Sequence, residues 1–176
     1  PLWAGFRGVT RGNGRAIPDR EGRLAQLFTD PTTAALDQAA RITEASTQFN
    51  VGVVTRTLNN PAMVLDLLDA RNQSSFVFVK AGEETSHGMR VWVLRGTERE
   101  SPTLITSVDG QDEPADVRAW VDSRTGRLGR AEVKVSSLTT DSVRGAPARL
   151  VATITVTFRE DKRLHIWVPA TMSERY

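Results

Sequence analysis

The chain has 176 residues, of which 39% are hydrophobic and 25% are charged, and its formal net charge is +2. This composition is typical of a folded globular protein with a single core. The basic residues are scattered singly, so no nucleic-acid partner is expected. No apolar stretch approaches the ~20 residues that a membrane-spanning helix needs, and the absence of cysteine excludes disulfides.

The first part of the chain carries the signals of one hairpin and three helices. Gly12-Asn13-Gly14 supplies residues that accept positive φ, which predicts a β-hairpin within residues 4–17. Three helices should follow, each opened by a capping residue: one from Asp19, one from Asp30-Pro31 to about Phe49, and one from Asn60-Pro61 to just before Asn72.

From Ser75 onward apolar and polar residues alternate with period two, which indicates strands. Connections of about four residues between several of them require antiparallel neighbours, because a parallel pair needs a long crossover. The sequence therefore predicts a β-meander of about seven strands: Phe76–Lys80, Met89–Thr97, Thr103–Thr106, Val117–Asp122, Leu128–Ser136, Arg149–Phe158 and Leu164–Ser173.

Alternation divides the predicted sheet into an apolar face, which should meet the helices, and a polar face. The polar face carries Trp120 and Trp167, and leaving two indoles uncovered would forgo several kcal/mol, at ~25 cal/mol per Å² of apolar surface. Three explanations stay open: arginine and threonine neighbours cover the rings, a partner or an upstream segment packs on them, or a ligand groove lies there. The apolar face consists of Ala119, Val121, Ala131, Val133, Val135, Ile154, Val156, Phe158, Ile166, Val168 and Met172.

No catalytic or metal-binding motif stands out. His87 and His165 lack the spacing of a zinc site, and Gly12-Asn13-Gly14 lacks the rest of a dinucleotide fingerprint. The acidic loop around Asp109 and Asp112 lacks the ligand spacing of a calcium loop. We therefore predict no catalytic residues, no metal and no cofactor.

Five stretches of the chain resemble an uncharacterised family of exported bacterial proteins: Asp19–Phe28, Arg71–Gln73, Trp120–Val133, Ala152–Phe158 and Trp167–Tyr176. The strand–Asp-x-x-Thr-Gly–strand hairpin at Asp122 is also similar to the lipoprotein-carrier superfamily, typified by the periplasmic lipoprotein localisation factors. The first resemblance implies a periplasmic or secreted location and an upstream helix and strand missing before Pro1. The second implies a curved half-barrel that binds acyl chains between sheet and helices.

The expected fold is thus one α+β domain over residues 1–176: an N-terminal hairpin and three helices on one face of a curved, seven-stranded meander. The expected function is that of a non-catalytic exported protein that binds or carries an apolar, lipid-like ligand. The alternative is a structural or protein-interaction module, whose Trp120 and Trp167 face would meet an upstream segment or another exported protein; an enzyme ranks third. The residues predicted to line the ligand site are Phe76, Phe78, Val121, Val133, Ile154, Val156, Phe158, Ile166 and Val168.

Overall fold

The computed structural model of the chain describes residues 11–12, 14–16, 63–86, 88–106, 110–140 and 147–175. The chain divides into two compact units, Pro1–Pro61 and Ala62–Tyr176. In the first unit, β1 (Arg11–Gly12) pairs antiparallel with β2 (Arg15–Ala16). Between them Gly14 has a φ of +76°, so the predicted hairpin turn is confirmed. The single domain over residues 1–176 stays a prediction.

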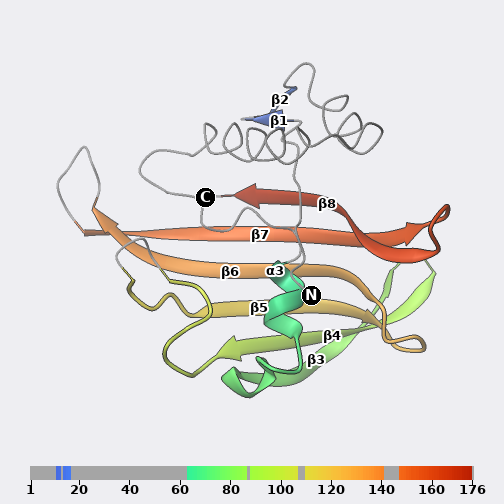
Figure 1. Ribbon diagram of the computed structural model, residues 1–176, viewed down its shortest axis with the longest axis horizontal. Coiled ribbons are helices and arrows are strands. Elements are labelled where there is room, and N and C mark those ends of the chain that lie inside the picture. The colour runs from blue at the N-terminus through green and yellow to red at the C-terminus, as the bar shows by residue number, and fades with distance from the viewer. Residues whose placement is uncertain are drawn as a thin grey trace, which may run out of the picture. The chain divides into compact units, whose positions relative to one another are not determined.

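The second unit is built on one open antiparallel sheet of six strands, arranged side by side in sequence order (Figure 1). A short helix, α3 (Met63–Leu68), and a single 3-10 turn, η1 (Gln73–Ser75), precede the first strand. The strands are rich in valine and threonine, whose branched side chains suit a pleated sheet. They are β3 (Phe76–Ser86), β4 (Met89–Glu98), β5 (Ala115–Asp122), β6 (Leu128–Thr140), β7 (Pro147–Asp161) and β8 (Ile166–Arg175).

The predicted α+β fold class is wrong. We expected three helices on a seven-stranded sheet in a carrier-like half-barrel, whereas the described residues form one open, six-stranded antiparallel sheet with one short helix. Of the three predicted helices only the third falls on described residues, where it is α3; the first two lie outside them. The meander itself is confirmed.

The predicted strand Thr103–Thr106, third of the seven in chain order, is absent. These residues are part of the β4–β5 loop and make one isolated bridge, Thr106 to Asp112. The physical reason is that side chains occupy its backbone donors. The N–H of Thr103 donates to Asp112 Oδ1 at 2.9 Å, and the N–H of Leu104 donates to Glu98 Oε1 at 2.7 Å. Those N–H groups are not available to a β-ladder.

The core lies on the sheet face that α3 crosses (Figure 1). Val64 and Leu67 of α3 are at most 1% exposed, as are Val117, Val133 and Ile154 at the centre of the sheet. Val133 pairs with Val117 on one side and with Ile154 on the other, so these three form a row across β5, β6 and β7. Burial of each such side chain contributes about 1.5–3 kcal/mol. The predicted apolar face is therefore confirmed across the middle of the sheet.

Candidate binding surface

Three turns of the sheet lie at the same end, because successive turns of an antiparallel meander alternate between its two ends. They are the turn at Gly88 between β3 and β4, residues 123–127 between β5 and β6, and residues 162–165 between β7 and β8 (Figure 1). We call this the hairpin end. The exposed residues around Trp167 described below belong to this end.

The β5–β6 and β7–β8 turns share one hydrogen-bonding arrangement. Asp122 Oδ1 accepts the N–H groups of the second and third residues after it, at 2.8 and 2.9 Å, and Asp161 Oδ1 accepts the equivalent pair at 2.9 and 3.1 Å. These hydrogen bonds hold the pKa of both carboxyls below the ordinary range, and the bond from the third residue's N–H contributes most to the lowering. The fourth residue after each aspartate has positive φ: Gly126 at +71° and His165 at +51°. A non-glycine residue there costs about 1 kcal/mol.

Trp120 stands on the polar face but is closed off by its neighbours. Its ring, 8% exposed, forms a buried cluster with Val91 and Val93. The guanidinium carbons of Arg118 and Arg130 lie 5.1 and 4.5 Å from the ring centroid, and the indole N–H donates to Glu84 Oε2 at 2.9 Å. Each polar and apolar part of the indole therefore has a partner within the sheet, and arginine stacking explains its position.

Trp167 is only partly covered. Its indole N–H donates to the carbonyl oxygen of Leu128 at 2.6 Å, and the guanidinium of Arg127 lies 5.3 Å from the ring centroid. These two contacts join the β7–β8 hairpin to the β5–β6 hairpin. The ring nevertheless stays 38% exposed, so the two tryptophans predicted to act together differ: one is satisfied, and the other presents apolar surface.

The tip of the β7–β8 hairpin exposes more apolar surface beside Trp167. Leu164 is 65% exposed, the highest value among the large hydrophobic side chains of the described residues, and Ile166 is 48% exposed. Lys162 and Arg163, both exposed, precede them directly. We call Lys162, Arg163, Leu164, Ile166 and Trp167 the tip surface. Apolar side chains are seldom grouped on an exposed turn without a partner to cover them.

Sequence reasoning placed Leu164 at the start of a strand and so missed this tip. The sequence did carry a signal for this turn, because the same pattern, an aspartate followed four residues later by a residue with positive φ, occurs twice. It is explicit in Asp122…Gly126 and hidden in Asp161…His165, where histidine replaces the glycine that marks such turns.

The nine residues predicted to line a ligand site do not all come together. Val133, Ile154 and Val156 are neighbours in the register of β6 and β7 and are almost fully buried. Phe76 and Phe78 stack with ring centroids 5.4 Å apart on β3. Buried residues are Phe76, Val133, Ile154, Val156 and Phe158; Phe78, Val121 and Val168 are half-buried; Ile166 is exposed.

A bulge separates Ile166 and Val168 from the other seven residues predicted to line the ligand site. The β7–β8 register shifts between Thr157 and Phe158, and beyond it Val168 pairs with Arg159 while Trp167 pairs with Glu160. Because alternation continues along β7, this pairing exchanges the faces that the sequence pattern predicted for Val168 and Trp167. Ile166 and Val168 consequently leave the core face, and Trp167 does not share the face of Trp120.

Two carboxylates organise the opposite end of the sheet. Glu98, 3% exposed, accepts the N–H of Leu104 and, at 3.0 Å, the N–H of Ala115, which closes the β4–β5 loop. Asp112 accepts hydrogen bonds from the Ser101 hydroxyl and from the Thr103 backbone and side chain, which lower its pKa. Both groups are occupied in holding loop backbone.

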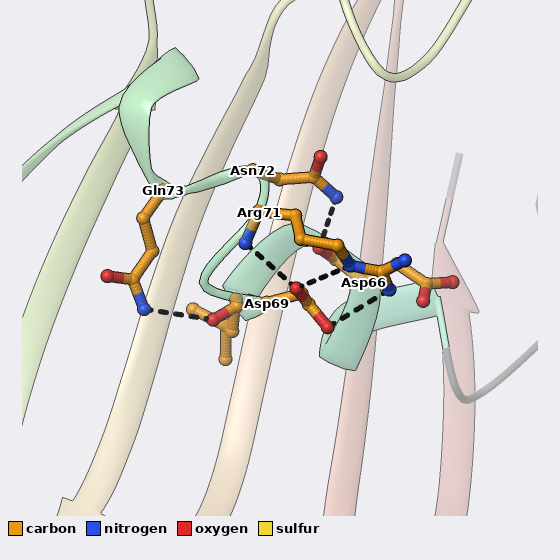
Figure 2. Close-up of polar contacts among 6 residues, drawn as sticks. Asp66, Asp69, Arg71, Asn72 and Gln73 are labelled. Carbon is orange, nitrogen blue, oxygen red and sulfur yellow. Dashed lines mark hydrogen bonds and ion pairs between the residues drawn. The ribbon is translucent and has the colours of Figure 1, made fainter. Parts of the chain in front are cut away.

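A third polar cluster ends α3 (Figure 2). The side-chain amide of Asn72 donates to the carbonyl oxygen of Asp66 at 2.8 Å, which also accepts the N–H of Asp69, and Gln73 donates to the carbonyl oxygen of Leu68 at 3.3 Å. Both side chains therefore bond to carbonyls at the end of the helix. Hydrogen bonds from the side chain and backbone of Arg71 lower the pKa of Asp69 to about 2. The cluster explains the Arg71–Gln73 motif as a helix stop.

Within the described ranges no group of three or more histidine and acidic side chains is arranged to hold a metal ion. No described helix has both the length and the apolar character required to cross a bilayer. In comparisons with known proteins, no family model, no curated protein and no solved structure matches this chain. The family resemblances and the exported location stay predictions.

Proposed function

We propose that the chain is a non-catalytic binding module that attaches to anionic membrane surfaces through the tip surface. The observation that carries this proposal is the exposure of Leu164, Ile166 and Trp167 at one hairpin tip, directly after the cations Lys162 and Arg163. A hairpin that enters a bilayer end-on buries side chains from both of its faces. It does not matter, therefore, that Ile166 and Trp167 point to opposite sides of β8.

The chemistry of the tip suits the boundary between headgroups and acyl chains. Tryptophan is favoured at that depth because its ring is apolar and its N–H is polar. Partial burial of three large apolar side chains provides a few kcal/mol at ~25 cal/mol per Å², and each basic residue near an anionic surface adds about 1 kcal/mol. Such a sum supports reversible attachment, which salt should weaken by screening the cations.

A protein partner fits the tip surface less well. Stable protein interfaces bury about 800 Å² on each side, which is far more than three side chains on a protruding turn supply. The carrier function predicted from the sequence is also less favoured. Val133, Ile154 and Val156 are at most 1% exposed, so an acyl chain could reach them only by displacing the groups that now cover them.

Vesicle co-sedimentation tests the proposal. The full chain should pellet with vesicles that contain one part phosphatidylglycerol in three, should pellet much less with pure phosphatidylcholine, and should be released by high salt. Leu164→Glu should reduce the bound fraction at least ~10-fold. The matched control is Leu104→Glu, because Leu104 is also an exposed leucine, 42%, but lies in the β4–β5 loop at the other end of the sheet.

Two results would contradict membrane attachment: no binding to anionic vesicles, or equal binding by the Leu164→Glu and Leu104→Glu proteins. Native mass spectrometry of the purified chain separates the carrier alternative. A co-purified lipid that survives Leu164→Glu would favour a ligand held inside the fold.

A further inference from the structure

β3 is an edge strand whose outer side pairs with no other described strand. Its first five residues, Phe76–Lys80, are regular and are rich in β-branched and aromatic side chains. Phe76 and Phe78 point toward the core face, whereas Val77 and Val79 stand on the other face and are 55% and 53% exposed. A regular apolar edge of this kind is a template for strand addition.

The register shows which backbone groups this edge offers. The N–H of Arg99 donates to the carbonyl oxygen of Ser75 at 2.8 Å, which makes that pair a hydrogen-bonded one. Hydrogen-bonded and non-hydrogen-bonded pairs alternate along an antiparallel ladder, so Val77 and Val79 bond to β4. The N–H and C=O groups of Phe78 and Lys80 therefore point outward. The C=O of Phe76 also points outward, while the N–H of Phe76 already donates to the carbonyl oxygen of Gln73.

We infer that two copies of this chain pair through β3, antiparallel and centred on Phe78. In this register Phe78 exchanges both of its hydrogen bonds with the second copy's Phe78. The N–H of each Lys80 meets the free C=O of the opposite Phe76, so the one donor that is already used is not required. The outward groups are complementary to themselves, as a two-fold interface demands.

Side chains follow the same symmetry. Val77 lies directly opposite the second copy's Val79 in a non-hydrogen-bonded pair, where side chains are closest. Both valine pairs fall on one face, so four half-exposed side chains cover one another. No heterologous partner is needed to supply an apolar match.

Features beyond Lys80 limit the pairing to this stretch. The β3–β4 register shifts between Lys80 and Gly82, and a bulge of this kind bends the edge away from a partner. Glu83 and Glu84 follow, and in the register centred on Phe78 they would lie opposite Gln73 and Asn72, which belong to the 3-10 turn and its cap and not to a strand. The contact is therefore small, and we expect a dimer that dissociates in the micromolar range or weaker. The inference is independent of the proposed membrane attachment: antiparallel pairing of β3 places the two hairpin ends at opposite ends of the joined sheet, so one membrane surface meets only one tip.

Sedimentation equilibrium of the full chain across concentrations tests the dimer. We expect a reversible monomer–dimer equilibrium, and Val79→Lys should raise its dissociation constant at least ~10-fold by placing charge among the valines. Val151→Lys is the matched control, since Val151 is an exposed strand valine, 44%, on β7. A strictly monomeric chain at millimolar concentration, or equal effects of the two lysines, would overturn the inference.

Cysteine cross-linking tests the register, because the chain has no cysteine of its own. Non-hydrogen-bonded antiparallel pairs have the Cα separation that a disulfide accepts. An oxidised mixture of the Val77→Cys and Val79→Cys proteins should give mainly mixed dimers, and each variant alone should cross-link poorly. Preferred 77–77 linkage, or a dimer that forms no mixed product, would rule out pairing centred on Phe78.

Discussion

Replacement of Trp120 by alanine should lower the free energy of unfolding by about 4 kcal/mol. The indole is 8% exposed and so hides most of the ~150–250 Å² that a tryptophan can bury. At ~25 cal/mol per Å² this burial is worth roughly 3.5–6 kcal/mol, an upper limit because unfolded chains bury some surface too. Tryptophan-to-alanine changes in cores cost about 3–5 kcal/mol, which places the expected loss near the lower half of the range.

Trp120→Phe separates the hydrogen bond from the ring. Phenylalanine keeps an aromatic face for Arg118 and Arg130 but has no N–H for Glu84, whose carboxylate accepts the indole bond at 2.9 Å. Glu84 is half exposed, so water can replace the lost donor. The expected loss is therefore only about 1–2 kcal/mol.

Urea unfolding followed by far-ultraviolet circular dichroism measures both losses, because the substitution itself alters indole fluorescence. Trp92→Ala is the matched control. Trp92 also carries a cation, with Lys80 Nζ 5.1 Å from its ring centroid, but it is 39% exposed and should cost clearly less. A loss below about 1 kcal/mol for Trp120→Ala, or equal losses for the two alanine variants, would refute the closed cluster around Trp120.

Three further predictions concern other parts of the sheet and its turns. Gly96→Ala should cost about 1–3 kcal/mol, because a Cβ there would overlap the ring of Phe78, and adding Phe78→Leu should restore part of the loss in a double-mutant cycle. His165→Gly should raise the melting temperature by about 1–2 °C, measured by calorimetry, since glycine relieves the positive φ at a cost in unfolded-chain entropy that offsets part of the gain. Asp122 and Asp161 have lowered pKa values in the folded state. The stability that they contribute is therefore present above their unfolded pKa of ~3.9 and is lost as the pH falls through the folded values. The Asp122→Asn/Asp161→Asn protein should show a flatter dependence of unfolding free energy on pH between about 4 and 2.

The meander could be predicted from the sequence because its signals are local. Alternation in β5, β6 and β7 is regular, and Gly126 marks the turn that joins the first two of these strands. Val117, Val133 and Ile154 accordingly lie in the core as expected. Where one face of a strand is strongly apolar, a one-residue slip would expose all of it, so the alternating pattern favours one register across the middle of these strands.

The failures arise where a long-range contact overrides a local pattern. β8 looks regular in sequence, but its pairing with β7 shifts between Thr157 and Phe158. The residues of β8 that precede this shift, Ile166 to Pro169, therefore face the opposite side of the sheet from the one that alternation predicts. The strand predicted at Thr103–Thr106 is lost because the carboxylates of Glu98 and Asp112, six and nine residues away along the chain, accept the hydrogen bonds of its backbone N–H groups. Neither bulges nor side-chain anchors of this kind leave a period-two signature.

The tip was missed for a different reason, which itself bears on function. The two Asp-anchored turns are built alike, yet Gly126 occupies the positive-φ position in one and His165 in the other. The fold accepts glycine at this position, so the strain at His165 is not required by the sheet. Strain that a fold does not need is retained where a side chain has a separate use. His165 stands between the exposed Leu164 and Ile166, and its Nδ1 lies 3.8 Å from Glu160 Oε1 across the hairpin. In the membrane proposal its side chain adds to the tip that enters the headgroup region, so His165→Gly should weaken vesicle binding even as it stabilises the fold.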